Sequence, residues 1–228
     1  MSEHLDPVAV NTAVWEQHAR ARIVAGDLDR RPAVHQFRWT RTSIDDPGPE
    51  LLGDVRGKHV VELGCGTGDN LAYLVDHRGA LGVGIDPAPS QLRRARARWP
   101  SPVFHCTDAA PYLATCEPID VCYSVFGAIG FCPPAPLLKL IYNRLVPGGL
   151  LAFSIRSGGL AKTRKPTCRL DFLEGMQGPV VRYDCGSDEW TDIFDRMGFC
   201  VAVAIVADEA SGPTTLILAA HLGASTET

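Results

Sequence analysis

The run from Val60 to Asn70, VVELGCGTGDN, constrains the fold of this chain more than any other stretch. Two β-branched residues lead to the acidic residue Glu62, and Asp69 stands at the start of the segment after the turn. Between these two acids, glycines occupy alternate positions, namely Gly64, Gly66 and Gly68. This pattern is typical of a buried strand that ends in a tight turn, with backbone amides exposed at a helix N-terminus. The turn is therefore predicted to hold a nucleotide-type cofactor.

The spacing of the glycines distinguishes dinucleotide cofactors from other nucleotide-type cofactors. A dinucleotide fingerprint requires G-x-G-x-x-G, in which the third glycine lets the helix pack closely and the first two let the pyrophosphate approach the helix amides. In this chain Asp69 occupies the place of the third glycine, and its carboxylate would repel a pyrophosphate. A nicotinamide-dependent, NAD(P)-linked oxidoreductase is therefore an alternative that the sequence disfavours.

The pattern that is present, E-x-G-x-G-x-G over residues 62–68, resembles motif I of class I S-adenosylmethionine (SAM) dependent methyltransferases. The cofactor of that family has no phosphate and carries a sulfonium and an amino group, which suit Glu62 and Asp69. The resemblance implies an α/β fold with a Rossmann-like, doubly wound, seven-stranded sheet, mostly parallel with an antiparallel C-terminal edge hairpin. It also implies SAM as cofactor and S-adenosylhomocysteine (SAH) as product.

Later segments match the family in order and spacing. Residues 81–86 end in Asp86, where the family's acid binds both ribose hydroxyls, and a third strand leads into Asp108, where the family's acid accepts a hydrogen bond from the adenine amino group. Residues 119–126 resemble the fourth strand, and residues 145–153 resemble the turn and fifth strand. The predicted cofactor contacts are Trp15, Glu62, Gly64, Cys65, Gly66, Gly68, Asn70, Asp86, Gln91, Asp108, Ala109 and Ser124.

Two segments fall outside this scaffold. Residues 1–50 contain a predicted helix from Asn11 to Arg22, and residues 156–184 form an insertion rich in Gly, Lys and Arg. Ligands of open α/β sheets lie beyond the carboxyl ends of the strands, so both segments are candidate lids on the substrate side. A packing helix and a solvated loop are the alternatives. We predict a single domain over residues 1–228 with its SAM-binding core at 57–221.

Local signals place the remaining elements. Asp69 is predicted to cap the first core helix, and the prolines and glycines of residues 45–53 indicate a linker. A further helix begins at Pro134 and ends before the Pro-Gly-Gly run at 147–149. The predicted elements near the end of the chain are a helix over 187–197, strands over 199–206 and 214–220, and a turn at 211–213.

Composition narrows the class of protein. A chain of 228 residues can bury one sizeable core, and a net charge of -4 argues against a general nucleic-acid binder, because phosphate neutralisation needs a basic surface. The beginning lacks a signal peptide pattern and no apolar run is long enough to span a bilayer, which predicts a cytoplasmic protein without membrane contact. Eight cysteines form no C-x-x-C pair, so we expect packing thiols and no metal. A monomer or a homodimer is compatible with these features.

The chemistry explains why few catalytic residues are visible. Methyl transfer from a sulfonium is an in-line displacement in which positioning supplies most of the rate, and a base is needed only when the acceptor must lose a proton. Weak candidates for a base are His18, His35, Tyr183 and Asp184, while His105 on the third strand better suits a core or cofactor-side position. The catalytic residue is therefore unknown at this point.

The residues after the fourth strand narrow the class of acceptor. The [DNS]-P-P-[YFW] motif of adenine and glutamine methyltransferases is missing there, and the chain instead has an apolar rim with Phe126 and Phe131. Such a rim favours a flat small molecule, as in aromatic or heterocyclic natural-product biosynthesis, over nucleic acid. Predicted acceptor contacts are His18, Phe126, Phe131 and Arg156. A non-catalytic SAM-binding regulatory protein is the second alternative.

Overall fold

The computed structural model describes residues 6–156, 167–172, 176, 178–185, 187–209 and 214–222. The helices are α1 (Pro7–Val24), α2 (Asp69–Arg78), α3 (Pro89–Arg98), α4 (Ala109–Thr115), α5 (Pro134–Tyr142) and α6 (Ser187–Met197), with short 3-10 turns η1 (Gly48–Leu52) and η2 (Ala128–Gly130). The strands are β1 (His59–Leu63), β2 (Leu81–Asp86), β3 (Val103–Cys106), β4 (Ile119–Val125), β5 (Leu145–Arg156), β6 (Thr167–Phe172), β7 (Pro179–Asp184), β8 (Phe199–Ala207) and β9 (Thr215–Leu222).

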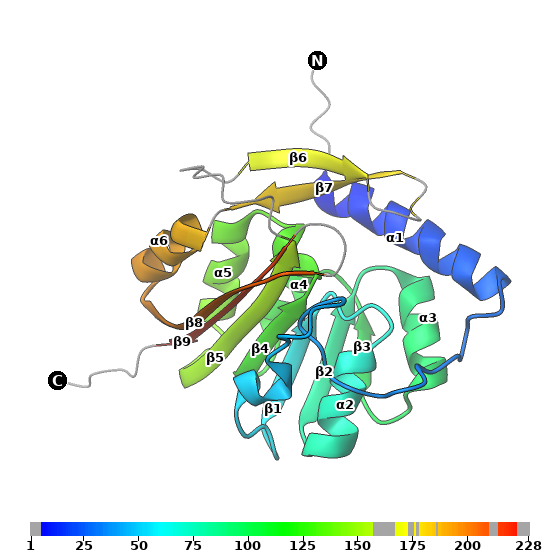
Figure 1. Ribbon diagram of the computed structural model, residues 1–228, viewed down its shortest axis with the longest axis horizontal. Coiled ribbons are helices and arrows are strands. Elements are labelled where there is room, and N and C mark those ends of the chain that lie inside the picture. Colours follow the sequence, from blue (N-terminus) through cyan, green and yellow to red (C-terminus); the bar gives the residue numbers. More distant parts are fainter. Residues whose placement is uncertain are drawn as a thin grey trace.

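Seven of these strands form one sheet in the order β3-β2-β1-β4-β5-β9-β8 (Figure 1). The pairs from β3 through to β5 are parallel, and β9 runs antiparallel to both of its neighbours. The predicted doubly wound sheet with a C-terminal antiparallel hairpin is confirmed. Its two last strands extend slightly beyond the predicted bounds, and the predicted turn at 211–213 lies outside the described residues.

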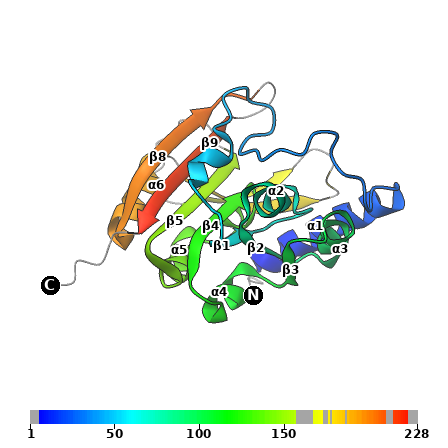
Figure 2. The same cartoon turned by 90° about the horizontal axis from the view of Figure 1, so that it is seen from below.

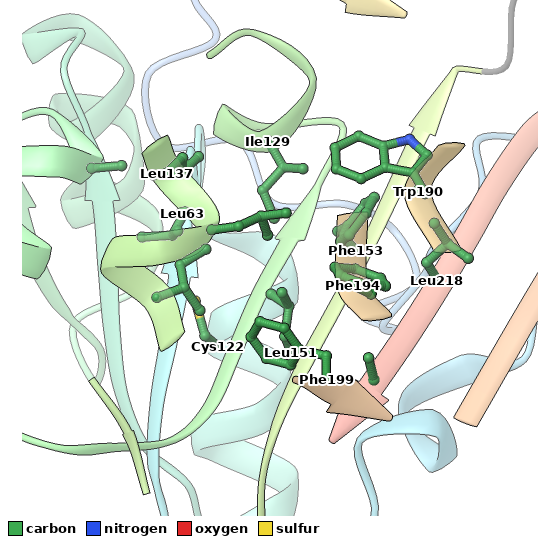
Figure 3. Packing of buried hydrophobic residues seen from close by; sticks show 14 of the residues in the cluster. Leu63, Cys122, Ile129, Leu137, Leu151, Phe153, Trp190, Phe194, Phe199 and Leu218 are labelled. Carbon is green, nitrogen blue, oxygen red and sulfur yellow. The ribbon is translucent and has the colours of Figure 1, made fainter. Parts of the chain in front are cut away.

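Helices cover both faces of the sheet because its central strands alternate apolar side chains between two cores. One core joins the sheet to α4, α5 and α6, and Figure 3 shows Phe153 of β5 facing Trp190 and Phe194 of α6. The rings of Phe153 and Trp190 lie 4.8 Å apart in an edge-to-face arrangement. The second core joins the opposite face to α2 and α3.

The segment after α1 covers the same face as α2 and α3. Phe37 and Trp39 are buried in the second core, and the Trp39 indole donates a hydrogen bond to the Gly48 carbonyl at 2.7 Å. Residues 45–53 are therefore not the predicted open linker, because η1 within them buries Leu52. The first fifty residues thus divide into a helix at the strand ends and a packed segment on the sheet.

Two further predictions are corrected. Helix α1 begins four residues before Asn11, since the Asp6 carboxylate accepts a hydrogen bond from the Val8 amide and Pro7 favours the first turn. Asp69 does not cap α2, because Gly68 takes the capping position with a left-handed backbone and Asp69 is the first helical residue.

The insertion contains a second sheet that the sequence did not predict. Strands β6 and β7 pair antiparallel, and they lie with α1 beyond one end of the main sheet (Figure 1). Viewed from below, α1 and α3 are neighbours on the side far from β8 (Figure 2). Among the described helices, none has the length and apolar character required to cross a bilayer.

Candidate active site

The carboxyl ends of the first four strands open into a cavity of about 620 Å³. Because these strands are parallel, the residues at the end of each of them meet at one edge of the sheet. Glu62 comes from β1, Asp86 from β2 and Asp108 from the end of β3, and all three side chains line the cavity. The structure thus brings these three acids together, while their ligand contacts stay predictions.

Two loops meet backbone to backbone at the floor of this cavity. Gly64 has φ of +74°, and a Cβ there would lie 2.6 Å from the Ala128 amide nitrogen. A Cβ on Gly127 would lie 2.4 Å from the Leu63 carbonyl oxygen. Both positions therefore exclude any side chain, and the β4–α5 loop closes directly on the glycine turn. Phe126 carries a left-handed φ of +49° at this junction, an uncommon backbone conformation for an aromatic residue.

Asp86 organises the turn by accepting backbone hydrogen bonds. One carboxylate oxygen accepts from the Gly66 amide and the other from the Ala88 amide, both at 2.9 Å. Burial nevertheless raises the pKa of Asp86 to about 6, with these hydrogen bonds opposing the shift. Each oxygen keeps a second lone pair, so the carboxylate can still accept from a ligand hydroxyl.

Glu62 is the most deeply buried acid of the cavity wall, with 3% of its surface exposed. Burial raises its pKa to about 8, and the charges of Asp69 and Asp86 add to the shift. The Tyr123 hydroxyl lies beside Glu62 and opposes the pKa shift as a hydrogen-bond donor, although Glu62 Oε2 makes no hydrogen bond of ordinary geometry among the described residues. A buried acceptor without a partner is costly, and a cationic group in the cavity would satisfy it.

The start of α2 contributes a further acid and an amide to the wall. Asp69 accepts hydrogen bonds from the Thr67 hydroxyl at 2.7 Å and from the Trp99 indole at 3.0 Å. The Asn70 side chain holds the backbone of Arg38 through two hydrogen bonds of 3.0 Å each. A carboxylate therefore stands beside the amides of the helix, where the phosphates of a dinucleotide would lie.

The side of the cavity next to α3 is a buried polar cluster. Gln91 accepts a hydrogen bond from Arg94 at 3.0 Å, and Arg94 in turn forms an ion pair with Asp27 at 2.8 Å. Arg98 binds the same carboxylate at 2.6 Å. Asp108 also lines the cavity, and burial raises its pKa. Among the described residues that line this cavity, Arg94 is the cation. Its positive charge is already compensated by the Asp27 carboxylate.

The other end of the cavity is mainly apolar. Trp15 of α1 contacts Phe131 edge to face, with ring centroids 6.1 Å apart. The wall at this end is completed by Val8, Asn11, Thr12, Cys132, Pro133, Pro136, Leu137 and Leu140. Phe126 and Ala109, two further residues predicted for the site, also line the cavity.

Some predicted site residues lie away from this cavity. The Ser124 hydroxyl is buried and donates to the Leu63 carbonyl at 2.7 Å, so it supports the strand that precedes the glycine turn. Gly68 packs under Phe104, where a Cβ would lie 2.6 Å from the ring. Of the described residues, those predicted for the site that do not line the cavity are Gly68, Ser124, His18, Tyr183 and Arg156.

The candidate bases also do not reach the cavity wall. His35 stacks on Trp99 with centroids 4.2 Å apart, and its Nε2 lies 2.9 Å from the Asp69 carbonyl oxygen. His105 lies against Tyr112 on the outer side of β3. The side chain of Asp184 is outside the described part of the structure. Within the described ranges, no group of three or more His, Cys, Asp or Glu residues is arranged to hold a metal ion.

Sequence reasoning missed two kinds of wall residue. Gly127 is required by the close approach of the two loops, which only the tertiary structure reveals. Asn11 had a signal, since it lies four residues before Trp15 and eight before Ala19 on the inward face of a predicted helix. A polar residue in an otherwise buried stripe indicates a specific partner.

Comparison with known proteins finds methyltransferases among the similar sequences and folds. A family profile described as a methyltransferase domain matches residues 60–149, which run from β1 into β5. The chain is 31% identical over 156 residues to a trans-aconitate 2-methyltransferase of Methylobacterium radiotolerans, covering 66% of this chain and 57% of the relative. It is 31% identical over 158 residues to the protein of that name from Variovorax paradoxus, covering 67% and 58%. The chain thus spans somewhat more than half the length of these curated relatives.

Solved structures share the fold at low sequence identity. An S-adenosylmethionine dependent methyltransferase from Mesorhizobium loti matches with a TM-score of 0.57 and 21% identity, covering 75% of this chain and 94% of that one. The 1,6-didemethyltoxoflavin-N1-methyltransferase of Burkholderia thailandensis, solved with its acceptor and SAH bound, matches with a TM-score of 0.64 and 15% identity over 98% and 93%. The domain profile over residues 60–149 and the relatives support a class I SAM-dependent methyltransferase with SAM as its cofactor, and the solved structures share its fold.

Proposed function

We propose that this chain is a SAM-dependent methyltransferase that acts on a flat, uncharged small molecule of the aromatic or heterocyclic kind found in natural-product biosynthesis. The observation that carries the proposal is the convergence of a glycine turn and the carboxyls of Glu62, Asp86 and Asp108 on one cavity whose far end is apolar. The polar end suits a charged nucleoside cofactor, and the apolar end suits a planar acceptor.

The residues of the polar end have separable roles in this proposal. When bound, SAM supplies an electrophilic methyl group on a positively charged sulfur. Glu62 would accept from the amino group and lose its proton as it does so, because a nearby cation favours the charged carboxylate. Asp86 would accept from the ribose hydroxyls, and Asp108 from the adenine amino group. Asn70 and Gln91 line the same cavity and complete the proposed cofactor contacts, whereas Trp15, which the sequence assigned to the cofactor, lies at the apolar end and is proposed to contact the acceptor.

The apolar end would position the acceptor and exclude water. Positioning of this kind can contribute roughly 7–11 kcal/mol to lowering a barrier. Among the described residues that line the cavity there is no histidine, lysine or tyrosine. Because the carboxyls of Glu62, Asp86 and Asp108 are assigned to the cofactor in this proposal, the rest of the wall favours an acceptor atom that is already unprotonated, such as an aromatic amine, a ring nitrogen or an electron-rich carbon.

A second candidate acceptor is trans-aconitate, because the curated relatives carry that name. A polycarboxylate needs unpaired cations, since burying a carboxylate without a partner is costly. The cation of the described wall is Arg94. Its guanidinium already forms an ion pair with Asp27 and donates a hydrogen bond to Gln91. The charge balance of the described part of the wall therefore favours an uncharged acceptor over a trianion.

The test is transfer of label from methyl-tritiated SAM to a defined panel of hydroxyquinolines, indoles and aromatic amines, with trans-aconitate as a separate arm. We expect label in at least one planar compound and none in trans-aconitate. Label in trans-aconitate alone would overturn the acceptor class. Label that stays entirely in SAM, with SAH binding intact, would favour the non-catalytic SAM-binding protein.

A matched variant controls for background transfer. Asp86→Ala lowers the proposed cofactor affinity without altering the apolar end, so transfer at low SAM concentration should fall in parallel for every methylated compound. The oxidoreductase alternative is tested by measuring whether the protein quenches or enhances the fluorescence of NADH. We expect no change in that fluorescence.

A further inference from the structure

Helix α1 crosses the cavity and is fastened on its two sides by buried or half-buried polar side chains. On the α3 side, the Glu16 carboxylate accepts hydrogen bonds from the Ser90 amide and the Ser90 hydroxyl, both at 2.8 Å. Ser90 is the second residue of α3, so Glu16 caps that helix from outside. The C-terminal half of α1 is thereby anchored to the Rossmann-like core.

On the other side, Asn11 joins α1 to the small sheet. Its Nδ2 donates to the Val181 carbonyl at 2.9 Å, and its Oδ1 accepts from the Val181 amide at 2.7 Å. The Asn11 side chain thus pairs with β7 as a neighbouring strand would, although the two residues are 170 positions apart. A further, longer contact of 3.4 Å joins Nδ2 to the Phe131 carbonyl at the rim of the cavity.

The same side chain also forms part of the cavity wall. Asn11 is 6% exposed and lines the apolar end together with Val8, Thr12 and Trp15 of the same helix. Strand β7 does not line the cavity among the described residues, yet it lies beside α1 (Figure 1). Any effect of β7 on the acceptor would therefore pass through the position of α1.

We propose that Asn11 is a positioning residue that makes α1 and the β6–β7 sheet a single lid over the acceptor end, so that the β6–β7 sheet sets acceptor affinity by holding the helix closed. This inference rests on the proposed function for the identity of the acceptor end. The coupling of the two segments itself is independent of catalysis. Without the Asn11 amide, Val181 would lose both partners and the two segments would move separately.

The main variant is Asn11→Asp, which keeps the shape but replaces the donor with an oxygen that faces the carbonyls of Val181 and Phe131. Asn143→Asp makes the same chemical change at an exposed residue that ends α5 and does not line the cavity. Asn11→Ser is the second variant, since it removes the pairing without adding charge and serves if the aspartate variant does not fold. Glu16→Gln weakens only the attachment to α3.

Hydrogen exchange followed by mass spectrometry measures the coupling without any acceptor. In Asn11→Asp or Asn11→Ser we expect segments 7–15 and 179–183 to exchange together at least about tenfold faster, while 59–63 and 69–78 exchange as before. Glu16→Gln should accelerate only the α1 segment, and Asn143→Asp neither. A change confined to α1, no change in either segment, or faster exchange throughout the domain would each overturn the single lid.

Kinetics then test the effect on the acceptor, using the compound of the planar panel that is methylated fastest. We expect Asn11→Ser to raise the acceptor KM about tenfold with kcat and SAH affinity within about twofold of the parent. Equal losses in kcat and SAH affinity would overturn the positioning role. If no panel compound is methylated, the proposed function fails, while the exchange experiment still decides whether the two segments are coupled.

Discussion

The two ends of the cavity are built in opposite ways. The polar end depends on short-range sequence, since the glycine turn and the acids at the strand ends each lie within a few residues of the strand that places them. The apolar end depends on long-range contacts, as Asn11 meets Val181 and Trp15 meets Phe131. This difference explains why cofactor chemistry can be predicted from a local motif, while acceptor chemistry is set by elements that the motif does not specify.

The largest effect on the polar end is expected from Gly64→Ala. A Cβ at Gly64 would meet backbone atoms of Ala128 and Gly127 at 2.6 and 2.8 Å, which cannot move aside as a flexible side chain would. We expect SAH affinity measured by calorimetry to fall at least about 100-fold, or the protein to lose its fold.

Gly148→Ala is the matched control for that substitution. Gly148 has a similar φ of +77° but nothing within 4 Å of its Cβ position, and it lies outside the cavity. It should cost about 1–2 kcal/mol of stability from the left-handed backbone and leave SAH affinity unchanged. Equal losses of SAH affinity in Gly64→Ala and Gly148→Ala would show that the close contact between the two loops is unimportant.

Asp86→Ala should weaken SAM binding by about 1–3 kcal/mol, roughly 5- to 150-fold, because the turn loses two hydrogen-bond acceptors and the ribose loses its proposed partner. Calorimetry measures this change. Asp120→Ala is the control, since Asp120 also accepts a backbone hydrogen bond, from the His59 amide, but lies outside the cavity. Unchanged SAM affinity in Asp86→Ala would remove this acid from the site.

The raised pKa of Glu62 predicts a pH dependence of the free protein. Its ordinary value of 4.5 is raised to about 8 by burial and by the neighbouring acids. Between these values the folded protein holds a proton that the unfolded chain releases, so stability falls as pH rises through this window. Tm should fall by up to about 4 °C per pH unit between about pH 5.5 and 7.5.

The variant Glu62→Gln shows how much of the pH dependence of Tm comes from Glu62 and how much comes from the other acids. The glutamine cannot ionise, so the variant should show a flatter profile of Tm against pH than the parent. Asp86, whose pKa is raised to about 6, would keep a weaker slope of the same sign below that pH. An unchanged profile in Glu62→Gln would contradict the proposed protonation.

The acceptor end is tested by removing its aromatic contact. Trp15→Leu and Phe131→Leu each abolish the edge-to-face pair, and such pairs contribute about 0.5–1.5 kcal/mol beyond their buried area. We expect the acceptor KM to rise roughly 2- to 12-fold in either variant, and less than additively in the double variant. Exact additivity would show that the rings act independently, and a loss of SAH affinity in Trp15→Leu would assign Trp15 to the cofactor instead.

His18→Ala should have the smallest effect. The His18 ring lies edge to face against Trp15 at 6.1 Å and does not line the described cavity. We expect kcat within about twofold of the parent at saturating acceptor, as for a substitution away from the site. A loss of about 100-fold or more would reinstate His18 as a general base.

The sequence predicted the seven-stranded, mostly parallel sheet with its antiparallel C-terminal hairpin, and most of the residues it named for the cofactor line the cavity. These features arise from period-two apolar strands, capping prolines and the glycine turn, all of which are local. It did not predict the β6–β7 sheet or the burial of Phe37 and Trp39, because these arise from contacts between distant segments. Ser124 was misplaced for a related reason, since the orientation of a strand-end hydroxyl depends on the neighbouring strand.

Equilibrium binding of SAH and SAM to the purified full chain, measured by isothermal calorimetry, tests directly whether the strand-end cavity holds this cofactor. We expect one site per chain, with affinity reduced in Asp86→Ala and unchanged in Asp120→Ala. A folded protein that takes up neither compound at millimolar concentration would contradict the assignment of the strand-end cavity to this cofactor.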